Sequence, residues 1–323
     1  MNSAYNPRWL GKGKWGLMFH YIDKPASSNT ASSTTAEEWN RRINGFDVAG
    51  FARQVKASKA GHVIFTLGQN TGHYCSPNSV YDEIVGDSPS LLSRRDLIAE
   101  IAEALSPDVP LIAYLPSHPP ANNASAVRAL GCLPPWDASA WGLQKTWADD
   151  ESADERLVVM QRNWQAVIAH WGERWGKSVA GWWIDGCYFS ERLYRSVEEP
   201  NFSSFARALR AGNPDRLLAF NAGTGTPFAR LAPEQDYTAG EFANRLPVPD
   251  KWTSIGASVE GMQTHLLGFL GNYWGAGEPR FPDLLMASYT NYLTARGAVL
   301  TWDVPIMENG VIAEAFIHQL ASI

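Results

Sequence analysis

The sequence predicts an α/β fold, most simply a (β/α)8 barrel of the TIM type. Short apolar runs alternate with helical patterns along the chain, which is typical of βαβ units around a parallel sheet. About eight such units can be counted, and 323 residues with 45% apolar side chains suffice for one barrel. We therefore expect a single domain over residues 1–323, with a doubly wound open sheet as the alternative.

The strands are identified as short apolar runs bounded by turn residues. We expect them at residues 15–21, 62–67, 109–115, 179–184, 217–220, 237–241, near 264–270 and at 298–302. The fifth is short and begins soon after Gly212-Asn213-Pro214, which ends a helix. The seventh strand is ambiguous, because the spacing of its apolar residues does not identify it clearly. The eighth follows Arg296-Gly297, a helix-ending pair.

The helices are identified by apolar residues at spacings of three and four. We expect them at residues 48–58, 90–105, 154–175, 201–211, 283–295 and 311–322. In the longest, one continuous apolar face is formed by Leu157, Met160, Trp164, Val167, Ile168 and Trp171. A Ser- and Thr-rich insertion at 26–36 and a Pro-, Ala- and Trp-rich one at 117–154 follow predicted strands, so both should lie over the cleft.

Composition excludes several classes of partner. The net charge is −6 and the basic residues are scattered, so nucleic acid is not expected. No apolar stretch is long enough for a membrane span, and the first eight residues lack the apolar core of a secretion signal, which predicts a soluble, cytoplasmic protein. Cys75, Cys132 and Cys187 lack metal-ligand spacing and are expected to be reduced thiols. We expect no metal and no cofactor, and the oligomeric state is not predicted.

Aromatic residues are abundant, with 14 Trp, 11 Tyr and 13 Phe. Carbohydrate clefts commonly use aromatic faces against sugar rings, although tryptophan also packs well in a core. The composition therefore favours a carbohydrate partner only modestly.

The segment from Gly181 to Tyr188 is the most informative in the chain. Asp185 follows an apolar run that reads as a buried strand and precedes Gly186. Parallel sheets and barrels open their clefts at the carboxyl ends of their strands, so Asp185 is a candidate functional carboxylate between Trp183 and Tyr188. The alternative is an aspartate that caps the following helix.

Other polar side chains follow the predicted strands and should share the same barrel mouth. Hydroxyl-rich ligands need such a ring of uncharged donors and acceptors. The candidate substrate-binding residues are His20, Tyr21, Gln69, Asn70, His73, Tyr74, Tyr114, Trp183 and Trp302, with His118, Asn221 and Asp303 nearby. For His20 the alternative is a satisfied core histidine, and for Gln69 and Asn70 it is a structural turn.

Glycosidic bond cleavage requires two carboxylates with different roles. Asp185 suits the nucleophile, because a strand end holds it rigidly. Glu241, after the predicted sixth strand, is the best candidate for the general acid/base, with a solvated surface glutamate as the alternative. Its rivals on predicted loops are Glu260, Glu278 and Glu308.

Several of these segments resemble the family 29 α-L-fucosidases. The first strand, Trp15-Gly16-Leu17-Met18-Phe19-His20-Tyr21, is similar to that family's first-strand motif, in which a His ends the strand. Trp183-Ile184-Asp185-Gly186 looks like the strand-four motif that carries the nucleophile and is the most specific match. Weaker similarities lie at residues 46–47, 61–64, 236–241, 297–300, 305 and 309–310.

The resemblance implies a retaining exo-glycosidase with a (β/α)8-like barrel and Asp185 as nucleophile. The chain departs from the family in having Gln69-Asn70 where a His-His pair is typical, Tyr21 where a Trp is typical, and no C-terminal β-sandwich. We therefore expect an α-L-fucosidase. The alternatives are a glycosidase for another terminal sugar, such as an L-galactoside, and a carbohydrate-binding barrel without catalysis.

Overall fold

The computed structural model describes residues 8–26, 28, 30–132, 156–189, 193–248 and 255–323. The strands are β1 (Trp15–Phe19), β2 (Val63–Thr66), β3 (Leu111–Pro116), β4 (Val179–Asp185), β5 (Leu217–Phe220), β6 (Ser258–Val259), β7 (Met262–Gln263), β8 (His265–Phe269) and β9 (Val299–Asp303). The helices are α1 (Arg8–Gly13), α2 (Ala36–Asn44), α3 (Val48–Ser58), α4 (Ser79–Val85), α5 (Leu97–Leu105), α6 (Ala124–Ala129), α8 (Val158–Trp175), α10 (Phe202–Leu209), α11 (Asp283–Thr294) and α12 (Glu314–Leu320), with short 3₁₀ helices η2 (Gly176–Ser178) and η3 (Cys187–Phe189).

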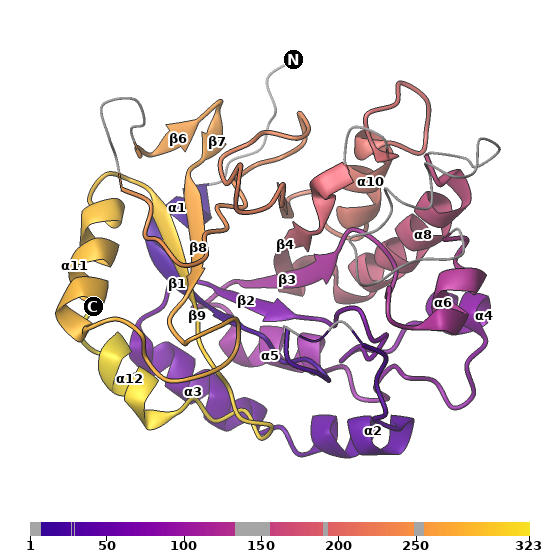
Figure 1. Ribbon diagram of the computed structural model, residues 1–323, viewed down its shortest axis with the longest axis horizontal. Helices are drawn as coiled ribbons and strands as arrows, with labels where there is room; N and C mark the ends of the chain where they lie inside the picture. Colours follow the sequence, from indigo (N-terminus) through magenta and orange to yellow (C-terminus); the bar gives the residue numbers. More distant parts are fainter. Residues whose placement is uncertain (1–7, 27, 29, 133–155, 190–192, 249–254) are drawn as a thin grey trace.

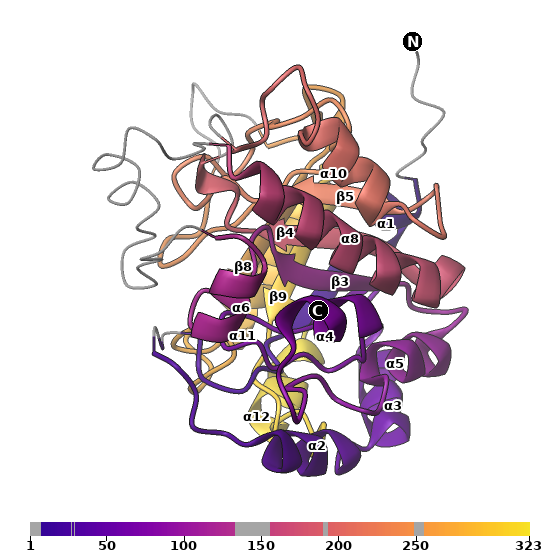
Figure 2. The same cartoon turned by 90° about the vertical axis from the view of Figure 1, so that its right-hand side faces the viewer.

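Seven parallel strands form one curled sheet in the order β5-β4-β3-β2-β1-β9-β8, with helices around it (Figures 1 and 2). The first strand pairs with both the second and the last, as barrel closure requires and a doubly wound sheet does not. The predicted TIM-like fold is therefore confirmed. The expected sixth strand is instead a segment that makes isolated bridges to β7 and β8, at Tyr237–Gln263 and Glu241–Leu267.

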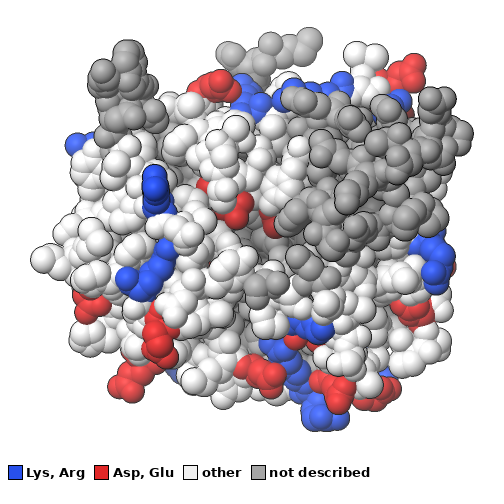
Figure 3. All heavy atoms as spheres, viewed as in Figure 1, with Lys and Arg blue, Asp and Glu red and all other residues white. Residues whose placement is uncertain are grey.

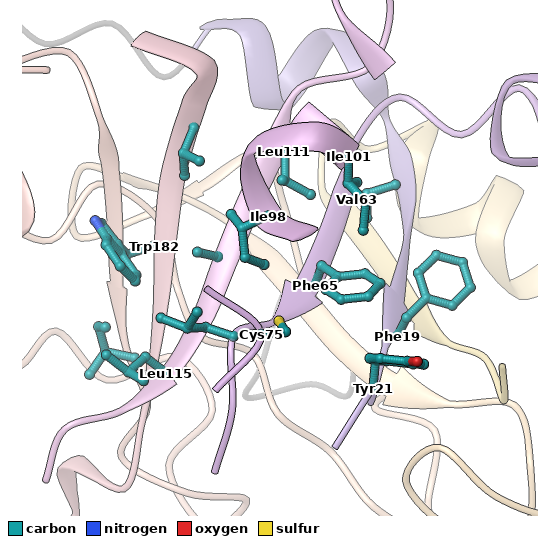
Figure 4. Close-up of a cluster of buried hydrophobic side chains, with 14 of the residues drawn as sticks. Phe19, Tyr21, Val63, Phe65, Cys75, Ile98, Ile101, Leu111, Leu115 and Trp182 are labelled. Atoms are coloured by element: carbon teal, nitrogen blue, oxygen red, sulfur yellow. The ribbon is translucent and has the colours of Figure 1, made fainter. Parts of the chain in front are cut away.

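Alternation along the strands separates the core into two apolar layers. Alternate side chains, such as Met18, Ile64 and Trp183, form a cluster that fills the barrel interior. Their neighbours in sequence belong to a second, larger cluster between the strands and the helices. Figure 4 shows part of this outer layer, where Ile98 and Ile101 of α5 cover β2 and β3. The side chain that ends each strand therefore faces either the barrel mouth or the helices, according to its register.

The predicted helix at 90–105 is wrong in its first half, because the helix begins only at Leu97. The Ser90 hydroxyl accepts from the Leu92 backbone, the Ser93 hydroxyl donates to the Arg95 carbonyl, and both bonds hold a turn. Asp96 then caps α5 through the Ala99 amide. Helix α2 was not predicted either, and its capping box at Thr35 lies at the end of the Ser- and Thr-rich insertion.

Arg216 joins the ends of two helices to the start of β4. Its side chain is fully buried and donates to the carbonyls of Gly172 and Gly176 at the end of α8, and of Leu209 and Ala211 at the end of α10. A further bond reaches the carbonyl of Val179. A cation here is favourable because unsatisfied carbonyls collect at helix C-termini.

Other expectations are settled in part. All three cysteines are buried free thiols, as predicted. Of the insertion at 117–154, residues 117–132 are described and include α6, whereas 133–154 lie outside the described residues. None of the described helices combines the length and the apolar character that crossing a bilayer would need.

Candidate active site

A pocket of about 110 Å³ lies at the carboxyl ends of the strands. Figure 3 shows a hollow near the middle of this face with acidic atoms inside it, while lysine and arginine side chains are scattered over the rest. Sequence reasoning had placed six of the lining residues in the site: His20, Gln69, Tyr114, Trp183, Asp185 and Glu241. The remaining lining residues are Met18, Ala26, Tyr188, Leu267, Tyr273 and Trp274.

Asp185 ends β4 and is held by donors on both of its carboxylate oxygens. The Tyr114 hydroxyl donates to Oδ2 at 2.6 Å, and the Gly186 amide donates to Oδ1 at 2.8 Å. Gly186 can turn its amide back onto this side chain because its φ of +71° lies in the left-handed region. A further donor to Oδ1, at 3.3 Å, is the hydroxyl of Tyr188 in η3. The carboxylate is therefore fixed in position while its residue remains partly exposed to the pocket.

Glu241 reaches the same pocket from the segment that stands between β5 and β8. Leu267 donates its amide to the Gly240 carbonyl and accepts from the Phe242 amide, both at 2.9 Å. Gly240 has a φ of +68°, and a Cβ on it would lie 1.9 Å from the His265 carbonyl oxygen. Only glycine permits this close approach to β8, which sets the position of the following Glu241.

Asn221, after β5, connects the two carboxylates. Its Nδ2 donates to Asp185 Oδ1 at 2.8 Å and to Glu241 Oε2 at 2.6 Å. Its own oxygen accepts from the Gly223 amide at 2.9 Å, and the side chain is fully buried. Because the same nitrogen contacts Asp185 Oδ1 and Glu241 Oε2, the distance between these two oxygens cannot exceed the sum of the two hydrogen-bond distances.

The environment of Glu241 favours its protonated form. Burial raises the pKa of Glu241 from 4.5 to about 7, and the negative charge of Asp185 adds to this effect. The Asn221 hydrogen bond and the nearby His20 act in the opposite direction but are smaller. Glu241 thus keeps a proton that it can donate near neutral pH.

A polar chain runs from Asp185 across the pocket wall. Gln69 Nε2 donates to the Tyr114 hydroxyl at 2.8 Å, and that hydroxyl donates to Asp185. Burial raises the pKa of Tyr114 well above its usual value, with the Asp185 charge as a second cause, so the phenol stays a donor. The Tyr114 ring stacks on Trp183 with 5.4 Å between ring centroids, which makes an aromatic floor.

His20 is oriented by Asp303 at the end of β9. The His20 Nδ1 lies 2.7 Å from Asp303 Oδ1, and Asp303 also accepts from the Gly275 amide at 2.5 Å. Because a carboxylate accepts, His20 carries its proton on Nδ1 when the ring is neutral. The ring packs 5.6 Å from the ring of Trp274, which also lines the pocket.

Two predicted binding residues, Tyr21 and Trp302, face away from this pocket. Tyr21 is fully buried in the outer layer beside Phe19 and Phe65 (Figure 4), and its hydroxyl donates to the Glu308 carbonyl. Trp302 is also fully buried and donates from Nε1 to the Thr290 hydroxyl in α11. Tyr21 is next to His20 in the sequence, and Trp302 is next to Asp303. Consecutive side chains of an extended strand point to opposite faces, so His20 and Asp303 point inward.

Three more predicted residues lie outside the pocket lining. Tyr74 is fully buried and packs on Trp171 with 5.2 Å between ring centroids. His73 is buried with both ring nitrogens beside Thr71 and Thr34. The backbone of Asn70 accepts from the Asn122 amide.

The aromatic pair Tyr273 and Trp274 was missed by sequence analysis. Both lie after β8 in a glycine-rich stretch, Gly271-Asn272-Tyr273-Trp274-Gly275, and this pattern is the signal that could have identified them. The rival acids Glu260, Glu278 and Glu308 do not line this pocket. Within the described part of the chain, no group of His, Cys, Asp and Glu side chains could hold a metal ion.

The sequence matches no protein-family model and no curated protein. Solved structures do match it. An endo-fucoidan hydrolase of glycoside hydrolase family 107, MfFcnA4, has 15% identity and a TM-score of 0.67 over 99% of this chain. The match covers 54% of that protein, so the present chain spans about half its length.

Two further structures are matched over most of both chains. A second family 107 endo-fucoidan hydrolase has 16% identity and a TM-score of 0.62, covering 97% of this chain and 91% of that one. The α-L-fucosidase AlfC from Lactobacillus casei, in complex with its α-L-fucose product, has 16% identity and a TM-score of 0.60, covering 98% and 97%. The chain therefore has a TIM-like barrel fold that is shared with fucose-acting glycoside hydrolases.

Proposed function

We propose that the protein is a retaining exo-glycoside hydrolase with Asp185 as nucleophile and Glu241 as general acid/base. The observation that carries this proposal is the pair of carboxylates in one pocket, held together by Asn221, with the pKa of Glu241 raised by burial. The matched structures act on fucose-containing substrates, and their shared fold supports a glycosidase.

The spacing of the carboxylates favours retention of configuration. The facing oxygens lie closer than the sum of 2.8 and 2.6 Å, because both accept from Asn221 Nδ2. Inverting enzymes hold their carboxyl groups about 6.5 to 9.5 Å apart to admit a water, whereas retaining enzymes hold them about 5 to 5.5 Å apart.

The proposed reaction proceeds in two steps. An Asp185 oxygen attacks the anomeric carbon as the glycosidic C–O bond breaks, and Glu241 gives its proton to the departing oxygen. The resulting Glu241 carboxylate then takes a proton from water while the water oxygen attacks the same carbon, which releases Asp185. Asp185 and then water attack opposite faces of the anomeric carbon. Each attack inverts the configuration, so the product keeps the configuration of the substrate.

A terminal α-L-fucoside is the substrate that we propose. The pocket of about 110 Å³ is smaller than the roughly 300 to 1,000 Å³ that drug-sized ligands occupy, which suits a single sugar ring. Trp183 and Trp274 offer apolar faces, while His20 and Gln69 offer hydrogen bonds to hydroxyls.

The test uses 4-nitrophenyl α-L-fucopyranoside and the matching α-L-galactopyranoside. We expect the wild type to release α-L-fucose first, as followed by proton NMR, and to prefer the fucoside. Asp185→Asn should lose at least about 1,000-fold in kcat, because the covalent step is removed. Full activity of this variant, or release of the β-anomer first, would contradict the assignment.

The acid/base is tested separately. Glu241→Ala should lose activity, and azide should restore turnover by giving the α-fucosyl azide, since a small anion can attack the intermediate without a general base. Asp215→Asn, an exposed position, serves as the control and should behave as the wild type. Sugar binding without turnover in the wild type would instead indicate a carbohydrate-binding barrel.

A further inference from the structure

One aromatic residue of the catalytic pocket is largely open to solvent. Among the described residues that line the pocket, Tyr273 alone is exposed, at 44%, whereas the others are buried or half-buried. A residue that both lines a pocket and is exposed to this extent lies at its rim, because protein covers the deeper walls. Tyr273 therefore stands where the pocket opens.

Tyr273 begins a tight turn that is fixed against the barrel. Tyr273 and Ala276 exchange backbone hydrogen bonds of 3.3 and 3.1 Å across the turn. Gly275 within it has a φ of +63°, and a Cβ on this glycine would lie 2.7 Å from the Cβ of His20. The Gly275 amide also donates to Asp303 Oδ2 at 2.5 Å. The turn is thus held by the same two side chains, His20 and Asp303, that pair beside the pocket.

The ring of Tyr273 packs on a buried aromatic side chain. Its centroid lies 5.9 Å from that of Phe269, which ends β8 and is 1% exposed. The Trp274 ring lies 4.9 Å from Phe269, and the Arg280 guanidinium lies 3.9 Å from its centroid. Tyr273 is therefore supported from the protein side. A tyrosine side chain has only two rotatable torsions, so ordering it against a ligand costs little conformational entropy.

The proposed exo-glycosidase places the leaving group at this rim. The pocket of about 110 Å³ suits one sugar ring beside Asp185 and Glu241, so the rest of the substrate extends toward the opening. Aromatic rings bind the apolar C–H faces of sugar rings. None of the described residues that line the pocket is a lysine or an arginine, so nothing among them is suited to an anionic ring.

We infer that Tyr273 binds the leaving group through its aromatic face, and that this leaving group is an uncharged sugar ring. The inference rests on the proposed function and adds a residue that selects among leaving groups. It makes Tyr273 important for a fucosyl disaccharide. It makes Tyr273 unimportant for α-L-fucosyl fluoride, whose leaving group is a single atom with no ring to stack.

The experiment measures kcat/KM on fucosyl-α1,6-N-acetylglucosamine and on α-L-fucosyl fluoride, and compares their ratio between variants. Both substrates are cleaved in the same pocket, so the ratio cancels any loss of folded protein. Tyr273→Ala should lower the ratio of disaccharide to fluoride about 3- to 10-fold, the size of one aromatic contact. Tyr273→Phe keeps the aromatic face and should keep the ratio. Leu284→Ala, which removes a side chain from a residue of α11 that is 79% exposed, is the control.

Two outcomes on active enzyme would overturn the inference. An unchanged ratio in Tyr273→Ala means that the leaving group does not touch this ring. A ratio that falls as far in Tyr273→Phe as in Tyr273→Ala means that the hydroxyl, not the aromatic face, makes the contact.

If the wild type cleaves neither fucoside, the proposed function fails and the sugar contact is judged by binding alone. Saturation-transfer NMR with methyl N-acetyl-β-D-glucosaminide then decides. Binding that Tyr273→Ala abolishes and Tyr273→Phe retains supports the contact. Binding that is absent, or that is equal in all three proteins, overturns it.

Discussion

Replacing Glu241 with glutamine should stabilise the protein in a strongly pH-dependent way. The folded state raises the pKa of this carboxyl from 4.5 to about 7. Below about pH 4.5 both folded and unfolded states bind the proton. Between pH 4.5 and 7 the unfolded chain releases it while the folded protein retains it, so the stability of the wild type falls as the pH rises. At about 1.4 kcal/mol for each pKa unit, the total is roughly 3 kcal/mol.

The Glu241→Gln variant lacks this titration and keeps an oxygen that can accept from Asn221. Its free energy of unfolding relative to the wild type should therefore rise by roughly 3 kcal/mol between pH 4 and pH 8. Urea denaturation followed by tryptophan fluorescence at both pH values measures the difference. Glu103→Gln, at an exposed position of α5, is the control and should show no comparable change. If the unfolding free energies of the variant and the wild type differ by the same amount at pH 4 and pH 8, the raised pKa of Glu241 is refuted.

Three further changes test other contacts. Tyr114→Phe removes the 2.6 Å hydrogen bond to Asp185 and should lower kcat/KM on the aryl fucoside about 10- to 100-fold, with unchanged kinetics counting against this role. Asp303→Asn keeps an acceptor for His20 but not its charge, so L-fucose affinity measured by calorimetry should fall about fivefold. An unchanged affinity would remove His20 from the binding site. Arg216→Met should cost at least about 3 kcal/mol in urea unfolding, because its helix-end carbonyls lose their donor; a smaller loss would mean that water replaces it.

Much of the fold could be predicted because apolar residues recur at different spacings in strands and in helices. The helix over residues 48–58 was predicted at its observed bounds, and Asp185 and Glu241 were expected together because each follows a strand. The helix at 90–105 was placed too early, since Leu91 and Leu92 continue the apolar pattern although the serines beside them hold a turn. Local side-chain bonding outweighed periodicity there.

The site was predicted less well than the fold. His20 and Tyr21 were treated alike, but a strand places consecutive side chains on opposite faces, so only His20 reaches the pocket. Trp274 lies in a loop, where apolar residues have no regular spacing.

The segment that carries Glu241 is attached to the barrel differently from the strand that carries Asp185. β4 is paired along its length with β3 and β5, whereas residues 237–241 make one isolated bridge to β7 and one to β8. The proposed nucleophile therefore stands in a continuous ladder, whereas the proposed proton donor stands on a segment with fewer bridges, and Asn221 joins the two side chains. Substitutions in the segment that carries Glu241 should therefore disturb the ladder that holds Asp185 less than substitutions within β4 itself.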